Sequence, residues 1–328
     1  MMTTPFHPTL SIIIPVHNRA DLLTETLDSL AALTGRPLEV VLVDNASTDG
    51  SLACCEAFKA RMEGPDFMVR VCSEPRPGAN FARNTGFQVS QGDYVWFFDS
   101  DDRLFPDSLT RLLVALRSSD NQDLLVFPYV IRDRMDRLHH RPHRFSADPT
   151  NHLIDPVVAT HNMCLTRNLV AMAGGWNPEL SRWQDFEFGF RVLLKASNIA
   201  WLEGLPFYEV RDHASSISNG RFIDDLPLLE NSLQAIRSTL DNLEDKALKN
   251  RLLKALGFKW ASLAGLVRKE GHKREAHPLM EAALDCLPSA ADDLSRSQLV
   301  ACKSLYWLTA WYGGLGGRGI WRLADALL

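Results

Sequence analysis

Short apolar runs alternate with amphipathic segments along the first third of the chain. The apolar runs are rich in β-branched and aromatic residues, which is typical of buried strands, and they occupy residues 10–16, 40–43, 67–72 and 94–98. The segment over residues 21–33 repeats apolar side chains at the spacing of an amphipathic helix, and we predict two further helices between the later runs, over residues 51–62 and 80–90. This alternation predicts an α/β fold with a mostly parallel sheet and right-handed crossovers. In such a sheet, ligands bind at the carboxyl ends of the strands.

The pattern changes beyond the fourth apolar run. A helix over residues 108–117 and a strand over residues 123–130 continue it, whereas the polar residues 132–151 predict a long loop. From residue 224 onward strand signals disappear, and leucines recur at helical spacing to the end of the chain. We therefore predict two halves of an α/β domain and a helical C-terminal extension, spanning residues 1–106, 107–220 and 221–328.

Composition narrows the class of protein. The chain has 328 residues, 46% of them hydrophobic and 23% charged, which indicates an ordered globular protein. Its formal net charge of -5 shows no basic excess, so we expect no nucleic-acid partner. The six cysteines lack CxxC spacing, and no leader peptide or long apolar span is visible. These features predict a cytoplasmic protein with reduced thiols.

Candidate chemistry follows two of the predicted strands. Asp99, Asp101 and Asp102 come directly after residues 94–98, and carboxylates in that number suit Mg²⁺ or Mn²⁺, which can bridge to phosphate. The alternative is a helix cap, but capping needs one carboxylate, and three adjacent ones repel each other unless a cation is near. Asp44 ends the second strand, where an acidic side chain can accept a hydrogen bond from a base or ribose; a turn cap is the alternative.

Four segments carrying these residues resemble the family-2 glycosyltransferases of the GT-A fold, in both order and spacing. The segments are Ser11–Arg19, Val43–Ser51, Pro77–Gly86 and Gly92–Asp102. The resemblance covers about residues 8–218 and implies a Rossmann-like domain whose first half binds the nucleotide sugar and whose second half binds the acceptor. It also implies inverting transfer of a hexosyl group from a nucleotide sugar, commonly a UDP-sugar, to an acceptor hydroxyl in polysaccharide or glycoconjugate synthesis.

The resemblance also implies roles for individual residues. It assigns the donor nucleotide to Pro15, His17, Asp44, Arg83 and Ser100. It assigns the divalent cation, Mn²⁺ or Mg²⁺, to the DxD carboxylates and to a histidine further along, which are Asp99, Asp101 and His213. For that histidine, a lone surface side chain is the alternative. Candidates for the wall around the sugar and acceptor are Trp176, Asp102 and Gln184, although tryptophan is more often part of a core.

An inverting transfer needs a general base for the acceptor hydroxyl. The family keeps a Glu-Asp pair there, and Trp183–Glu187 resembles that place, with Gln184 replacing the first acid. If residues 184–195 form a helix, Glu187 and Arg191 make an i,i+4 ion pair worth roughly 0.3–0.5 kcal/mol, which gives Glu187 a structural role. Asp185 has no such partner, so we predict that it is the base.

Gln184 leaves a second function open, that of a catalytically impaired module that binds a nucleotide sugar. Two other enzyme classes are excluded by their motifs. The turn after the first strand, Pro15–Arg19, has no glycine, which excludes the GxGxxG motif of a nicotinamide-dependent dehydrogenase, and no GxxxxGK[ST] motif of a P-loop enzyme occurs.

Two further segments bear on the partners. Residues 137–144 gather Arg137, His139, His140, Arg141, His143 and Arg144, which could contact an anionic or lipid-linked carbohydrate acceptor; a solvated loop is the alternative. Residues 305–322 gather tryptophan, tyrosine and glycine, as interfacial membrane segments do. Packing of the helical extension explains that segment equally well. Peripheral contact with the inner face of the cell membrane is therefore a hypothesis.

Overall fold

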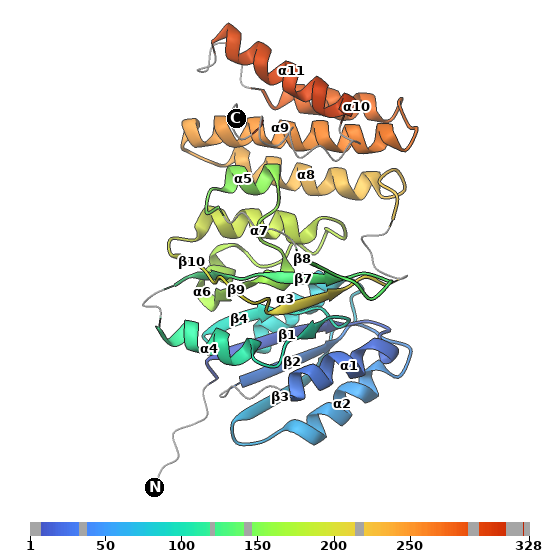
Figure 1. Ribbon diagram of the computed structural model, residues 1–328, viewed down its shortest axis with the longest axis vertical. Coiled ribbons are helices and arrows are strands. Elements are labelled where there is room, and N and C mark those ends of the chain that lie inside the picture. Colours follow the sequence, from blue (N-terminus) through green and yellow to red (C-terminus); the bar gives the residue numbers. More distant parts are fainter. Residues whose placement is uncertain are drawn as a thin grey trace. The chain divides into compact units, whose positions relative to one another are not determined.

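The computed structural model describes residues 8–32, 38–118, 122–140, 146–213, 220–287 and 295–312, together with residue 324 (Figure 1). The described residues form two compact units. The first unit draws on Met1–Phe145, Val158–Ser181 and Lys195–Ser216, and the second on Ser146–Val157, Arg182–Leu194 and Ile217–Leu328.

A seven-stranded sheet forms the centre of the first unit. Its strands, in spatial order, are β10 (Ile199–Trp201), β6 (Leu124–Val126), β9 (Met163–Thr166), β4 (Tyr94–Phe97), β1 (Leu10–Val16), β2 (Leu38–Asp44) and β3 (Phe67–Ser73). Every residue of β1 and β2 is buried, as expected for strands covered on both faces. The predicted α/β class and mostly parallel sheet are confirmed.

The direction of the strands brings six carboxyl ends to one edge of this sheet. β1 pairs in parallel with β2 and β4, β2 with β3, and β10 with β6. β9 is antiparallel to both of its neighbours, β4 and β6. Those two neighbours therefore run in the same direction, and the loops after β1, β2, β4, β6 and β10 all leave the sheet on the edge where α/β proteins bind ligands.

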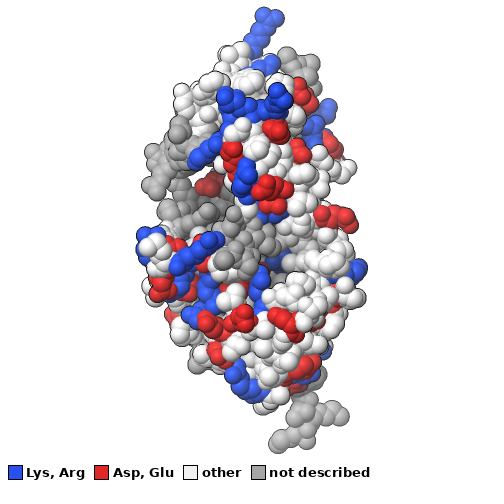
Figure 2. Space-filling model, turned by 90° about the vertical axis from the view of Figure 1, so that its right-hand side faces the viewer, with Lys and Arg blue, Asp and Glu red and all other residues white. Residues whose placement is uncertain are grey.

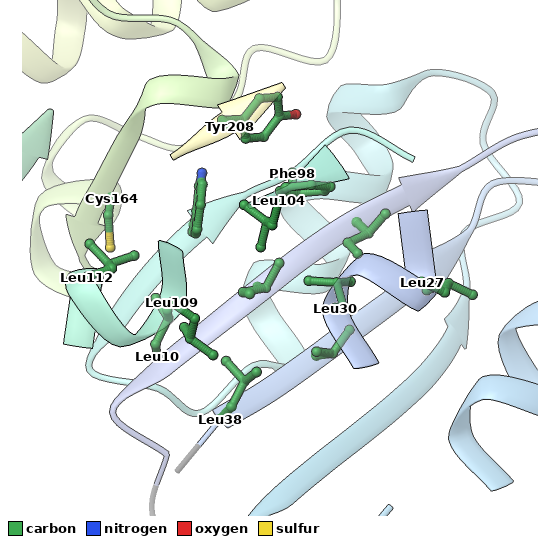
Figure 3. Packing of buried hydrophobic residues seen from close by; sticks show 14 of the residues in the cluster. Leu10, Leu27, Leu30, Leu38, Phe98, Leu104, Leu109, Leu112, Cys164 and Tyr208 are labelled. Carbon is green, nitrogen blue, oxygen red and sulfur yellow. The ribbon is translucent and has the colours of Figure 1, made fainter. Parts of the chain in front are cut away.

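Helices cover both faces of this sheet. They are α1 (Ala20–Ala31), α2 (Ser51–Met62), α3 (Ala79–Val89), α4 (Ser108–Ser118) and the short α6 (Arg167–Met172). Figure 3 shows leucines of α1 and α4 meeting the sheet in one apolar cluster, which includes Leu30, Leu109, Leu10 and Leu38. α3 packs closely against β1, and this contact needs a glycine at residue 86. A Cβ at Gly86 would lie only 2.4 Å from Ile13 Cγ2.

A second sheet corrects two of our predictions. Its strands, in spatial order, are β5 (Arg103–Leu104), β11 (Tyr208–Arg211), β7 (Tyr129–Arg132) and β8 (Leu138–His140). The single strand predicted over residues 123–130 is instead β6 and β7, which lie in different sheets; Pro128 separates them and has no N–H for a continuous ladder. The predicted loop over residues 132–151 contains β8 and the start of α5 (Pro149–Ile154), since the β7–β8 hairpin pairs Arg132 with Leu138.

The second unit is helical. Besides α5, it contains most of α7 (Gln184–Lys195), together with α8 (Leu226–Asp241), α9 (Lys246–Lys269), α10 (Ala276–Asp285) and α11 (Arg296–Tyr312). α9 is the central helix, and its buried Leu252, Leu256 and Leu263 share a core with α8, α10 and α11. The predicted helical C-terminal region is confirmed. Within the described ranges, none of the helices is both long and apolar enough to span a membrane.

Candidate functional site

The loops after β1 and β2 are tied together at the carboxyl edge of the sheet. Asn18 adopts a positive φ of 49°, and its backbone N–H donates to Ser47 Oγ at 3.1 Å. Its side-chain oxygen accepts from the Thr48 N–H at 2.8 Å. The Asp49 carboxylate accepts from the Ala20 N–H at 3.1 Å, where α1 begins. These bonds hold the two loops in one arrangement.

His17 is held in one tautomer by its two neighbours. Its Nδ1 lies 2.6 Å from the carbonyl oxygen of Asn45, and because a carbonyl only accepts, Nδ1 carries the proton. Nε2 then accepts from Asn18 Nδ2 at 3.3 Å. The Asn45 side chain donates to the carbonyls of Glu74 and Arg76 at 2.9 and 2.7 Å. The imidazole is therefore fixed beside the loops after β2 and β3.

Asp44 ends β2 next to this imidazole, in a buried position. The residue is 5% exposed, and its register partner is Val16, one residue beyond Pro15. Among the described residues, no donor reaches Asp44 Oδ1, which is itself buried. A buried polar atom without a partner costs about 1–3 kcal/mol. Such an atom at a ligand-binding sheet edge is the arrangement expected of an acceptor that a ligand N–H completes.

Arg83 of α3 binds the loop after β4. The residue is 4% exposed. Its Nη1 donates to Asn80 Oδ1 at 3.0 Å, and its Nη2 donates to Asp99 Oδ1 at 2.8 Å. Asn80 in turn donates to the carbonyls of Asn177 and Leu180 at 2.7 and 2.9 Å. Arg83 thus holds Asp99 in place at the sheet edge.

The indole of Trp176 lies in the core. It is 1% exposed and makes an edge-to-face contact with Phe97 at 5.3 Å between ring centroids. The Arg83 guanidinium lies 4.5 Å from its ring centroid, and Asn84 bonds both its N–H and its carbonyl, at 2.9 and 2.8 Å. Its exposure leaves no ring face for a sugar, so we do not carry forward the proposed place of Trp176 in the sugar wall.

The three clustered carboxylates have three different sets of partners. Asp99 pairs with Arg83, as described. Asp101 Oδ2 lies 2.9 Å from His213 Nε2 and 3.4 Å from Arg19 Nε. Asp102 accepts from the Tyr208 hydroxyl at 2.7 Å and from the Arg211 N–H at 2.8 Å. These protein groups reduce the repulsion among the three carboxylates, which we expected a bound cation to reduce. Repulsion alone therefore does not require a metal here.

The donor atoms at Asp101 still fit a divalent cation that is shared with a ligand. Asp101 Oδ2 and His213 Nε2 are neighbours, and both side chains are partly exposed, at 19% and 18%. Within the part of the chain that the structure describes, no group of three or more histidine, cysteine or acidic side chains could hold a metal. Mg²⁺ and related ions are commonly held by one or two carboxylates plus substrate phosphates. The pair therefore suits a cation whose other ligands are phosphate oxygens and water.

Asp102 is structural rather than exposed to a substrate. The residue is 4% exposed. Burial raises the pKa of its carboxyl group well above the ordinary value, and the neighbouring charges of Asp101 and Asp99 raise it further. Both of its oxygens bind β11, through Tyr208 and Arg211. Asp102 thus joins the loop after β4 to the second sheet.

Two residues of β11 that we did not identify from the sequence hold this loop. The Tyr208 hydroxyl accepts from the Asp99 N–H at 3.3 Å while it donates to Asp102. The Arg211 guanidinium donates to the Asp101 carbonyl and, at 2.8 Å, to Glu25 of α1. Neither residue belongs to a motif that the sequence analysis identified. Ser100, a predicted nucleotide contact, is 7% exposed, and its carbonyl accepts from Thr26 Oγ1 at 3.0 Å.

Removing the Tyr208 hydroxyl tests this bracing. The variant Tyr208→Phe leaves the Asp99 N–H and one oxygen of the buried Asp102 without their partner. We expect the free energy of unfolding of the first unit to fall by about 1–3 kcal/mol, measured by urea denaturation. Tyr312→Phe, which removes an exposed hydroxyl from α11, is the control. An unchanged unfolding free energy in Tyr208→Phe would contradict the bracing role.

The predicted base lies in the second unit, at the start of α7. Asp185 is partly exposed, and its Oδ1 accepts from the Phe186 N–H at 2.9 Å. Gln184 is the first residue of the helix and is also partly exposed. The Arg191 guanidinium donates to both carboxylate oxygens of Glu187, from Nε at 2.6 Å and from Nη2 at 2.7 Å. The predicted Glu187–Arg191 pair is confirmed.

The basic segment on the β7–β8 hairpin is partly neutralised. Asp133 accepts from His139 Nε2 at 2.7 Å and lies 2.8 Å from Arg137. These donors hold the pKa of the Asp133 carboxyl well below its usual range. His140 is exposed, whereas Arg141, His143 and Arg144 lie outside the described residues. The described part of the segment is therefore an ion-pair cluster rather than a patch of free positive charge.

Comparison with known proteins gives consistent matches. Residues 11–173 match the model of "Glycosyl transferase family 2". The poly(ribitol-phosphate) beta-glucosyltransferase of Bacillus spizizenii is 38% identical over 104 residues, which are 31% of this chain and 16% of that protein. Glycosyltransferase GlyG of Streptococcus pneumoniae is 31% identical over 39% of this chain and 41% of its own length. The matched part is thus less than half the length of these relatives.

Solved structures show the fold. S. aureus TarS residues 1–349, solved with UDP-GlcNAc, superposes with a TM-score of 0.70 at 18% identity, covering 97% of this chain and 91% of that one. The mannosyltransferase PcManGT of Pyrobaculum calidifontis, solved with GDP-Man and Mn²⁺, has a TM-score of 0.58 at 18% identity over 98% and 87% of the two chains. By its family match, its four motif segments and this likeness, the chain belongs to glycosyl transferase family 2 and has the GT-A fold with a helical C-terminal region.

Proposed function

We propose that this protein transfers a sugar with inversion from a UDP-sugar to an acceptor hydroxyl. The family supports a nucleotide-sugar donor, and S. aureus TarS, which has the same fold, was solved with UDP-GlcNAc. The acceptor is a carbohydrate or a lipid-linked carbohydrate of a polysaccharide or glycoconjugate. The observation that carries the proposal is the buried, unpartnered oxygen of Asp44 at the carboxyl end of β2.

Asp44 supports a nucleobase contact for a physical reason. Its Oδ1 is an acceptor without a donor among the described residues, and the uracil ring carries one N–H that can donate a hydrogen bond to it. Pro15 lies on the neighbouring strand β1, paired with Val43, and the His17 imidazole after that strand is fixed by the carbonyl of Asn45, the residue that follows Asp44. Binding of the base then removes the free-energy penalty of leaving this buried oxygen without a hydrogen bond. This differential contact would make the site selective for a base with an N–H at that position.

The variant Asp44→Asn separates binding from stability. We expect UDP affinity to fall by about tenfold, because the amide oxygen of asparagine is a weaker acceptor than a carboxylate oxygen; calorimetric titration measures the change. The unfolding free energy should not fall, because Asp44 Oδ1 has no donor to lose. Asp49→Asn is the control: its carboxylate already accepts from Ser51 and Ala20, so that variant should lose stability instead. Undiminished UDP binding in Asp44→Asn would contradict the base contact.

The other donor contacts are charged. Asp101 and His213 would hold Mn²⁺ or Mg²⁺ together with the diphosphate, and Asp99 would support the site through its bond to Arg83. When bound, the cation supplies Lewis-acid stabilisation of the leaving diphosphate. Arg19 and Arg83 add positive charge near that group, with side chains 23% and 4% exposed. Ser100 would contact the nucleotide through the same loop.

Asp185 would act as the general base that takes the proton of the attacking acceptor hydroxyl. Two observations within the second unit support it over its neighbours. Glu187 is buried and bound on both oxygens by Arg191, whereas Asp185 is partly exposed. Gln184 has no carboxylate and would contribute only amide hydrogen bonds to the acceptor.

Turnover distinguishes this proposal from a module that only binds a nucleotide sugar. The purified protein should release UDP from one member of a panel of UDP-sugars in the presence of Mn²⁺, slowly by hydrolysis and faster with an acceptor saccharide. UDP binding without release from any UDP-sugar or GDP-mannose would favour the impaired module instead.

The helical extension supports a second, weaker proposal of membrane contact. α11 exposes Trp307, Leu308, Trp311 and Tyr312, at 50%, 48%, 64% and 46%, and Arg268 lies 4.3 Å from the ring centroid of Trp311. Aromatic and basic side chains in this combination suit a lipid interface; Trp321 and Arg322 lie outside the described residues. In a co-sedimentation assay with vesicles that contain anionic lipid, the wild type should be found in the pellet, whereas the double variant Trp307→Ala/Trp311→Ala should stay in the supernatant. Equal sedimentation of both proteins would count against the contact.

A further inference from the structure

A cavity of about 260 Å³ lies at the carboxyl ends of β6 and β10. Trp201 ends β10, and Tyr129 follows β6 by three residues. These two rings line the cavity together with His140, Glu203 and Gly204. Because β6 and β10 run in the direction of β1, β2 and β4, the cavity lies at the same sheet edge as the donor residues. None of the residues assigned to the donor lines it.

The loop that closes this cavity is held in place by α4. Arg111 Nη1 donates to the Leu205 carbonyl and Nη2 to the Pro206 carbonyl, each at 2.7 Å. The guanidinium also lies 3.9 Å from the ring centroid of Phe207. Gly204 has a φ of 106°, and a Cβ there would meet nothing within 4 Å. The loop between β10 and β11 is therefore preformed and open at its tip, as a binding site should be.

The lining suits a neutral sugar ring. Trp201 is partly exposed and presents aromatic surface, which packs against the C–H face of a pyranose, while His140 and Glu203 offer hydrogen bonds to its hydroxyls. Tyr129 is 6% exposed and contributes to the wall of the cavity. Glu203 is exposed and makes no hydrogen bond or ion pair with another residue in the described ranges. Its carboxylate would repel a phosphate. The volume falls below the roughly 300–1,000 Å³ of sites for drug-sized ligands, which fits a single sugar residue.

We propose that this cavity is a carbohydrate subsite, which binds a neutral hexopyranose residue of the acceptor. The inference rests on the glycosyltransferase function proposed above. None of the residues assigned to the donor or to the general base is among the described residues that line the cavity. The sugar bound here is therefore a further residue of the acceptor and not the one that receives the new bond. It instead selects acceptors that extend at least one residue beyond the reacting hydroxyl.

Titration of defined trisaccharides tests this subsite. Cellotriose, chitotriose and maltotriose are titrated into the wild type, Trp201→Ala and Glu203→Gln, with UDP and Mn²⁺ present. We expect at least one trisaccharide to bind the wild type and to bind each variant about tenfold more weakly, as for the loss of one stacking contact or one charged hydrogen bond. The matched controls are Trp307→Ala and Glu56→Gln, which remove an exposed tryptophan and an exposed glutamate elsewhere.

The outcomes separate the subsite from the proposed function. The inference is overturned if no trisaccharide binds the wild type, if Trp201→Ala and Glu203→Gln bind as the wild type does, or if glycerol 3-phosphate displaces the trisaccharide. UDP affinity is measured in the same variants and should be unchanged, which excludes misfolding as the cause of any loss. A wild type that binds a trisaccharide through Trp201 but fails to bind UDP would refute the proposed function and leave the subsite standing.

Discussion

Asp185→Asn should reduce sugar transfer by about 10²–10⁴-fold, the contribution of a positioned general base, while UDP affinity stays at the wild-type value. The amide keeps the size of the side chain but cannot take a proton. Asp185 lies in the first turn of α7, where its Oδ1 accepts from the adjacent Phe186 N–H, and an asparagine oxygen can accept the same bond. The loss should therefore appear in kcat rather than in nucleotide binding. Single-turnover transfer with a labelled donor measures it.

The pH dependence and a neighbouring variant sharpen this prediction. In the wild type, transfer should decline at low pH as the base is protonated, and this acid limb should disappear from the residual activity of Asp185→Asn. Glu187→Gln is the matched control, because its carboxylate is bound on both oxygens by Arg191. That variant should lower the unfolding free energy by about 1–3 kcal/mol and keep the acid limb. If Asp185→Asn transferred sugar at the wild-type rate, Asp185 would not be the general base.

Asp101→Asn should lower kcat by about 10²–10³-fold, the typical loss when one group that stabilises developing charge is removed. Asp101 and His213 are the pair of donor atoms that fits a shared cation, and an amide oxygen is a far weaker ligand for Mn²⁺ than a carboxylate. The dependence of the rate on Mn²⁺ should shift to higher concentration in the same variant. Transfer assays over a range of Mn²⁺ concentrations measure both effects.

A second Asp–His pair provides the control for this variant. Asp133 and His139 lie 2.7 Å apart on the β7–β8 hairpin, with the same chemistry as Asp101 and His213 at 2.9 Å. Asp133→Asn should change neither kcat nor the Mn²⁺ dependence. If the two variants behave alike, or if Asp101→Asn keeps its Mn²⁺ dependence, the cation does not bind at Asp101.

The order of elements in the first unit was accessible from the sequence because each strand and helix shows its own periodicity. The apolar run over residues 10–16 and the helix over residues 51–62 have the observed bounds. The second sheet was not accessible, since β5, β7, β8 and β11 span only two to four residues each. Elements that short carry no readable period, and their pairing depends on contacts distant in the chain.

The candidate site divides in the same way. Motif order pointed to the loops that carry His17, Asp44 and Asp101, but motifs do not report burial, and so the sequence did not show that Trp176 and Asp102 are buried. The bracing residues Tyr208 and Arg211 act across more than 100 positions of sequence. Their role depends on tertiary geometry that no local pattern encodes.

We propose that the loops after β1, β2 and β4 form a donor site that binds a nucleotide and a cation together. Calorimetric titration of UDP into the wild type, with Mn²⁺ or with EDTA and with GDP as the comparison, measures this binding. UDP should bind with Mn²⁺, EDTA should weaken its binding at least about tenfold, and GDP should bind less tightly. Binding of neither nucleotide under any of these conditions would show that these loops are not a donor site.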